Sequence, residues 1–302
     1  MTEKSLSEQL FEEEYVRAID QQLKEFVLEN KDVFQAAFIK DREKAIPHTQ
    51  VLDKMYSFIL LCFTENLFET SHEAEKLFLA KIVSNIHGVR MLLDSGCPSE
   101  ALMVTRGLLE CYILLKYMNT KFDKYADLYV NHSLYERYFR ARNNAHDYTT
   151  EHLVEFRRDY DKVKDHYVEK KPWYYKVLQR DLLEKYGRNR SNKPKKKPSL
   201  MNMAELVGLI ESYKIDYNIY SVPVHASSSM QFLHVREGDY WLAPNFDERI
   251  IDSIVYSTFN YAYKSLDLVL KREVKGKTEL YRTYLSYLWA KVTENVKPNY
   301  VE

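Results

Sequence analysis

The chain has 302 residues, 45% hydrophobic and 29% charged, which is typical of a folded globular protein and excludes a disordered chain. Its 44 basic and 44 acidic residues balance, so the net charge attracts neither nucleic acid nor a membrane surface. Seven glycines and eight prolines are too few for a turn-rich β-sandwich or barrel. We expect an all-α fold: one helical domain over 1–302, a multi-helix bundle of about ten helices with one small β-hairpin near 231–244.

Several kinds of site and compartment are also excluded by the sequence. The glycines are too scattered for a dinucleotide-binding loop or a P-loop. The metal-binding pattern E-x-x-H occurs only at Glu69 and His72, so we expect no metal and no cofactor. Charged residues interrupt every apolar stretch before 18 residues, which predicts no membrane span. Three cysteines without a C-x-x-C pair indicate reduced thiols and a cytoplasmic location: Cys62, Cys97 and Cys111.

Apolar residues recur at intervals of three and four along most of the chain, which predicts helices. The first 70 residues are expected to form an N-terminal helical extension. A loop is predicted over 187–198, where six basic residues and two prolines fall within twelve positions. The predicted helices span 5–38, 49–67, 71–93, 98–121 with a continuation to about 170, 173–186, 201–213, 247–271 and 277–295.

Two helix boundaries have specific signals. Ser71 is a plausible N-cap for the helix over 71–93, and Glu75 lies near the capping-box position. Gly96 suits the position just after a helix end, and Pro98 suits the first turn of the next helix. We therefore place a sharp break between these two helices.

The helix that follows carries the most informative pattern. Within 101–115, ALMVTRGLLECYILL, the polar residues are Thr105, Arg106 and Glu110, so the helix is expected to lie inside the protein. Arg106 and Glu110 are four positions apart and share one face. Burying an ion pair rarely adds stability, so two interpretations stay open: the pair orients packed helices, or Arg106 binds an anion such as phosphate.

A second polar pattern lies at Tyr217, Ser221 and His225, at intervals of four. Pro223 interrupts any helix between the last two, so His225 follows a break, where its side chain is free to face a pocket. A histidine titrates near neutral pH, as a general base requires. The alternative is a hydrogen-bonded structural histidine, because no carboxylate lies nearby in sequence to orient it.

Together these two patterns resemble a known family. Gly96, Ala101, Arg106 and Glu110 read as G-x4-A-x4-R-x3-E, and the later residues read as Y-x3-S-x3-H. This combination resembles the signature of a bacterial family of unknown function, DUF5677, over about 78–259. The resemblance implies an α-helical core in which Arg106, Glu110, Ser221 and His225 converge, and it brings no settled activity.

A looser similarity is to the HEPN superfamily of helical bundles, many of which are metal-independent ribonucleases with an R-x4-6-H motif. Arg140 and His146 have this spacing, which also arises by chance in a chain of this composition. Ala141 departs from the polar residue that usually follows the arginine. The similarity implies RNA as a substrate.

Two functions of different classes follow. The first is a HEPN-like helical effector of the defence or toxin type, which acts on RNA or a nucleotide phosphate and, as an enzyme, cleaves phosphodiester bonds without a metal. The second is a non-catalytic interaction module whose polar residues are structural. Many aromatic and helical faces suggest a homodimer. The expected catalytic residues are His225, Arg106, Glu110 and Ser221, and the expected substrate-binding residues are Tyr217, Arg140 and His146.

Overall fold

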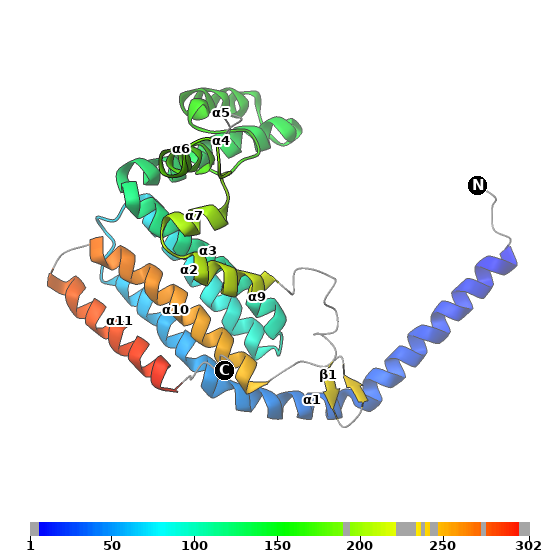
Figure 1. Cartoon of the computed structure of the whole chain (residues 1–302). Helices are drawn as coiled ribbons and strands as arrows, with labels where there is room; N and C mark the ends of the chain where they lie inside the picture. Colours follow the sequence, from blue (N-terminus) through cyan, green and yellow to red (C-terminus); the bar gives the residue numbers. More distant parts are fainter. Residues whose placement is uncertain are drawn as a thin grey trace.

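The structure is a computed structural model, and it describes residues 6–189, 194–221, 234–236, 239–241, 247–272 and 276–295. This part of the chain is mostly helical, as the sequence predicts (Figure 1). The α-helices are α1 (Leu6–Thr64), α2 (Glu73–Asp94), α3 (Pro98–Met118), α4 (Phe122–Asn143), α5 (Thr150–Val163), α6 (Tyr175–Tyr186), α7 (Leu200–Leu206), α8 (Ile210–Ser212), α9 (Asn218–Ser221), α10 (Glu248–Arg272) and α11 (Gly276–Asn295). Shorter helical turns are η1 (Asn119–Lys121), η2 (Ala145–Asp147), η3 (Lys164–His166) and the π-helix η4 (Tyr213–Tyr217).

Helix α3 lies at the centre of the bundle, as predicted. It packs on α2 and α10, while α1 packs on both of these and α11 covers α10. The short helices α7 and α9 cover another face of α3 (Figure 1). Where α3 and α10 meet, the buried hydroxyl groups of Thr105 and Thr258 lie 3.0 Å apart. The polar Thr105 is therefore hydrogen-bonded inside an apolar helix interface.

Helices α4, α5 and α6 form a second layer beyond the end of α3 (Figure 1). A partly buried carboxylate, with its side chain 11% exposed, joins this layer to α3. Asp181 of α6 accepts hydrogen bonds from the hydroxyl of Tyr117 at 2.6 Å and from the ammonium of Lys121 at 2.9 Å. The hydroxyl of Tyr125 donates to the same carboxylate. One carboxylate thus fixes the positions of α3, α4 and α6.

The prediction of two helices over 5–38 and 49–67 is wrong. These residues form one continuous helix, α1, with Pro47 inside it. From Ala45 onward the helix buries side chains such as Leu52 and Met55 in the core. This packing holds the helix together across a proline, which alone costs about 3 kcal/mol inside a helix. The N-terminal part projects away from the bundle (Figure 1).

The boundary between α2 and α3 lies where it was predicted. Helix α2 ends at Asp94, Gly96 adopts a φ of 68° and α3 begins at Pro98. The N-cap of α2, however, is His72 and not Ser71. The ring nitrogen Nδ1 of His72 accepts a hydrogen bond from the backbone N–H of Ala74, and Glu75 accepts one from the backbone N–H of His72. The capping box is therefore present one residue later than expected.

The long helix predicted to run to about residue 170 is divided. Helix α4 ends at Asn143, and Thr149 caps α5 by accepting a hydrogen bond from the N–H of His152 at 3.3 Å. A threonine at the N-cap position signals the start of a helix. The prediction followed the tyrosine-rich pattern and did not use this signal. After α5 the chain turns back toward α6 through a loop in which Lys170 has a φ of 58°.

The predicted hairpin over 231–244 is described only at its centre. Strands β1 (His234–Arg236) and β2 (Asp239–Trp241) pair antiparallel, with Val235 opposite Tyr240. The rest of the predicted range lies outside the described residues. In the basic loop, Lys196 contacts the bundle. It forms an ion pair with Glu205, and its Nζ lies 4.2 Å from the ring centre of Tyr186.

Candidate functional site

The candidate site begins with Arg106 and Glu110 on α3. The Nε of Arg106 donates to Glu110 Oε1 at 3.0 Å, so the predicted pairing along one helix face is present. The side chains are 26% and 32% exposed, which corrects the expectation of a fully buried pair. The cost of desolvating the ion pair is correspondingly smaller. On this face of α3, Arg106 contacts Tyr217 of the segment 210–221.

Tyr217 is a second partner of Arg106 and comes from a different helix. The Nη2 of Arg106 donates a hydrogen bond to the hydroxyl of Tyr217, and the guanidinium carbon lies 4.1 Å from the centre of the tyrosine ring. Tyr217 is the last residue of the π-helix η4. Its ring stacks on Tyr213, with the two ring centres 4.4 Å apart. Arg106 is therefore held by a carboxylate, a hydroxyl and an aromatic face together.

The π-helix itself is informative about function. A π-helix inserts an extra residue into a helical turn and is found frequently at functional sites. Here it spans Tyr213 to Tyr217, so that these two tyrosines stack while Asp216 contacts α10. Burial raises the pKa of Tyr213 to about 12, with the neighbouring Tyr217 adding to the effect. The hydroxyl of Tyr213 is therefore protonated at neutral pH.

A second group of polar residues, not predicted from the sequence, lies where Asp216 of η4 contacts Tyr261 of α10. The hydroxyl of Tyr261 donates to Asp216 Oδ2, and Lys264 Nζ lies 5.9 Å from the ring centres of Tyr112 and Tyr261. Burial raises the pKa of Asp216, although the hydrogen bond from Tyr261 opposes the shift, and burial lowers the pKa of Lys264. Charged residues within apolar helical stretches were the available signal, as they were for Arg106.

The other two predicted catalytic residues are Ser221 and His225. Ser221 is buried, and its hydroxyl donates to the backbone carbonyl of Tyr217 one turn earlier. Serines in helices commonly make this bond, and it occupies the hydroxyl proton. His225 lies outside the described residues. The structure therefore brings Arg106, Glu110, Tyr217 and Ser221 into one neighbourhood.

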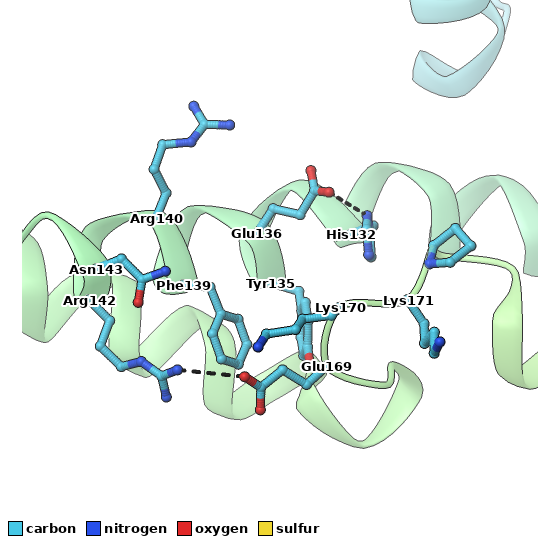
Figure 2. A pocket seen from close by; sticks show the side chains of 11 residues that line it. His132, Tyr135, Glu136, Phe139, Arg140, Arg142, Asn143, Glu169, Lys170 and Lys171 are labelled. Atoms are coloured by element: carbon cyan, nitrogen blue, oxygen red, sulfur yellow. Dashed lines mark ion pairs between the residues drawn. The ribbon is translucent and has the colours of Figure 1, made fainter. Parts of the chain in front are cut away.

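The R-x4-6-H residues lie elsewhere. Arg140 on α4 lines a hollow of about 600 Å³ between α4 and the loop 169–172 (Figure 2). His146 lies in η2 with its side chain 79% exposed, and it contacts Asp147 at 3.4 Å. Neither residue is among the described residues that contact Arg106. Of the three predicted substrate-binding residues, Tyr217 therefore contacts Arg106, and Arg140 and His146 lie elsewhere.

The described residues form neither a metal site nor a membrane span. Within this part of the chain, no group of three or more histidine, cysteine, aspartate or glutamate side chains is arranged to hold a metal ion. No helix among the same residues is long and apolar enough to cross a membrane. Cys62 and Cys111 are buried and Cys97 is partly buried, and all three are free thiols.

Comparison with known proteins identifies the family. Neither the curated proteins nor the solved structures provide a match to this chain. The model of a family of unknown function, DUF5677, matches residues 72–240. The matched range includes α3, the π-helix and both halves of the polar pattern. Because this range covers more than half of the chain, the protein belongs to the DUF5677 family.

Proposed function

We propose that this protein binds a phosphate group of RNA or of a nucleotide at Arg106. The observation that supports the proposal is the way Arg106 is held. Glu110 and Tyr217 fix the guanidinium from two sides, yet about a quarter of the side chain is exposed. A guanidinium that is already oriented loses little conformational entropy when it binds an anion.

The hydrogen-bonding capacity of Arg106 is consistent with this role. Its guanidinium has five N–H donors in a planar fork. Among the described residues, Glu110 and Tyr217 each accept one hydrogen bond from it. The remaining donors are suited to two parallel hydrogen bonds with phosphate oxygens. Glu110 also neutralises part of the arginine charge, which favours a phosphodiester over a more highly charged ligand.

A catalytic step would add His225 to this site. His225 follows Ser221 by four residues, beyond the C-terminal end of α9. We assign it the role of general acid or base in cleavage of a phosphodiester bond, with Arg106 holding the phosphate. Glu110 and Ser221 are the proposed positioning residues. This enzyme assignment is tested separately from binding, because a phosphate-binding site need not cleave its ligand.

The binding test is a titration with a short single-stranded RNA that has no terminal phosphate, followed by calorimetry. We expect Arg106→Lys to weaken binding about tenfold, because lysine lacks the planar fork. Arg282→Lys is the matched control: Arg282 is 27% exposed and pairs with Asp267 and Glu279. Equal affinity in the Arg106→Lys variant and the unmodified protein would refute the proposal. For the enzyme assignment, His225→Ala should abolish RNA cleavage while leaving RNA binding intact.

A non-catalytic interaction module is the second candidate, and Ser221 favours it. The serine hydroxyl is already bonded to the carbonyl of Tyr217, which is a structural use of a residue expected in catalysis. In that case Arg106→Lys and Arg282→Lys would both lower the thermal unfolding midpoint, and neither the unmodified protein nor the variants would bind the RNA. The same titration therefore separates the two candidates.

A further inference from the structure

The hollow beside α4 is separate from the Arg106 site. Its volume of about 600 Å³ is within the range of small-molecule binding sites. One wall is formed by α4 and the other by the loop that leads to α6 (Figure 2). Its lining residues are His132, Tyr135, Glu136, Phe139, Arg140, Arg142, Asn143, Glu169, Lys170, Lys171 and Pro172.

Positive charge exceeds negative charge in this hollow. Two arginines and two lysines line it, against the two carboxylates of Glu136 and Glu169. Only Arg142 among these cations forms an ion pair with a described residue, at 3.7 Å from Glu169. Arg140, Lys170 and Lys171 make no ion pair within the described part of the chain. Burial lowers the pKa of His132, with Glu136 opposing the shift, so this histidine is neutral at pH 7.

The backbone of Lys170 provides a second, independent observation. Its φ of 58° lies in the left-handed region, which is favourable for glycine and unfavourable for lysine. The surrounding loop is anchored: the hydroxyl of Tyr167 donates to the carbonyl of Leu128 at 2.7 Å, and Trp173 is buried. The N–H of Lys171 closes the turn on Val168 at 3.0 Å. The chain thus carries a lysine where its backbone favours a glycine.

The direction of the Lys170 side chain gives a reason for a lysine at this position. Figure 2 shows Lys170 extending from the loop across the hollow toward Phe139. Phe139 also lies under the guanidinium of Arg142, which is 4.5 Å from the centre of its ring. The strained turn therefore places an ammonium group on the same side of α4 as a fixed guanidinium. Local strain that positions a charged side chain in a hollow is characteristic of binding sites.

We infer that this hollow is a second anion-binding site, which takes a small molecule bearing a phosphate monoester. The excess of two positive charges matches a phosphate monoester, which carries about −1.5 to −2 charges at pH 7. Lys170 and Arg142 flank the phosphate beside Phe139, whereas the Lys171 ammonium lies 5.5 Å from the ring centre of Tyr175 and adds positive charge from farther away. A phosphodiester strand carries one charge per phosphate and matches this excess less well. The inference is independent of the function proposed for Arg106.

The experiment measures binding of adenosine 5′-monophosphate, inorganic phosphate and uncharged adenosine to the full chain by calorimetry. Lys170→Gly removes the ammonium and relieves the backbone strain, so the variant should be as stable as the unmodified protein or more stable. We expect it to bind the nucleotide and phosphate about tenfold more weakly. Lys171→Gln should weaken both as well, and adenosine should not bind.

Asn66→Gly is the matched control, because Asn66 also has a positive φ, of 53°, and lies outside the hollow. It should leave the affinity for phosphate unchanged. Arg106→Lys distinguishes the two sites: loss of all nucleotide binding in this variant, with full binding in Lys170→Gly and Lys171→Gln, would overturn the inference and leave the proposed function standing. Absence of any phosphate or nucleotide binding to the unmodified protein would overturn the inference, whereas the proposed function falls only if the single-stranded RNA also fails to bind.

Discussion

The ring centre of Tyr217 lies 4.1 Å from the guanidinium carbon of Arg106, and the tyrosine hydroxyl accepts a hydrogen bond from the same side chain. The two residues are 111 positions apart. This contact fixes η4 against the middle of the central helix α3. The orientation of the arginine therefore depends on the π-helix, and a change in either element alters the proposed phosphate site.

The two parts of this contact can be separated by substitution. Tyr217→Phe keeps the aromatic face and removes the hydroxyl, so it should cost about 0.5–1.5 kcal/mol of unfolding free energy. Tyr217→Ala also removes the ring, and we expect a total cost of about 2–4 kcal/mol. Urea unfolding at pH 7 measures both values. Equal losses in the two variants would show that the ring contributes nothing to the stability of this contact.

Glu110→Ala should reduce the stability by about 1 kcal/mol, because the pair is half-buried and the stranded arginine still reaches solvent. A fully buried pair would have cost about 3–5 kcal/mol. The matched control is Glu184→Ala, since Arg180 and Glu184 have the same order and spacing on α6 and are more exposed. Thermal and urea unfolding compare the two variants. A loss of 3 kcal/mol or more for Glu110→Ala would show that solvent does not reach Arg106.

The stabilising role of Asp181 should depend on pH. Burial raises its pKa, but the hydrogen bonds from Tyr117, Tyr125 and Lys121 outweigh that effect and lower the pKa below its ordinary value of 3.8. Because the folded-state pKa is depressed, the stabilisation is complete above pH 3.8 and is lost as the pH falls through the lower folded-state value. Asp181→Asn should therefore cost about 2–3 kcal/mol at pH 7 and progressively less below pH 3.8.

Urea unfolding between pH 7 and pH 2 tests this dependence. Asp161→Asn is the control, because Asp161 also has a lowered pKa, chiefly through a hydrogen bond from Lys164, but its side chain is 41% exposed, against 11% for Asp181. Its substitution should change the stability much less at every pH. A difference between the unmodified protein and Asp181→Asn that stays constant over the whole range would contradict the assignment.

The features of the fold that were predicted correctly are determined by residues close together in the sequence. Gly96 favours the end of one helix and Pro98 the first turn of the next, so the boundary between α2 and α3 follows from two residues. The central position of α3 follows from its nearly continuous apolar surface. These features need no knowledge of the neighbouring helices.

The features that were missed depend on contacts between distant residues. Pro47 remains helical because residues from Ala45 onward pack into the core, which a local pattern does not reveal. The π-helix and the contact of Asp216 with Tyr261 arise where two segments 45 positions apart meet. For the candidate site, the pairing of Arg106 with Glu110 was predictable from their spacing. The part played by Tyr217 as a partner of the guanidinium was not.

The basic loop gives a final prediction, in which structural and binding roles are assigned to different lysines. Lys196 pairs with Glu205 and lies against Tyr186, whereas Lys195 and Lys197 are exposed. Lys196→Ala should therefore lower the stability by about 0.5–1 kcal/mol. The double variant with alanine at 195 and 197 should unfold at the same temperature as the unmodified protein.

If the loop contacts RNA, the double variant should show a weaker dependence of affinity on salt. Each lost phosphate contact reduces the slope of log affinity against log salt concentration by about 0.7 for a single strand, so the slope should fall by up to about 1.4. Fluorescence anisotropy with a labelled single-stranded RNA, measured from 50 to 200 mM salt, gives both slopes. Identical slopes for the two proteins would show that Lys195 and Lys197 contact no phosphate, which would leave Lys196 as a structural residue and Arg106 as the proposed phosphate contact.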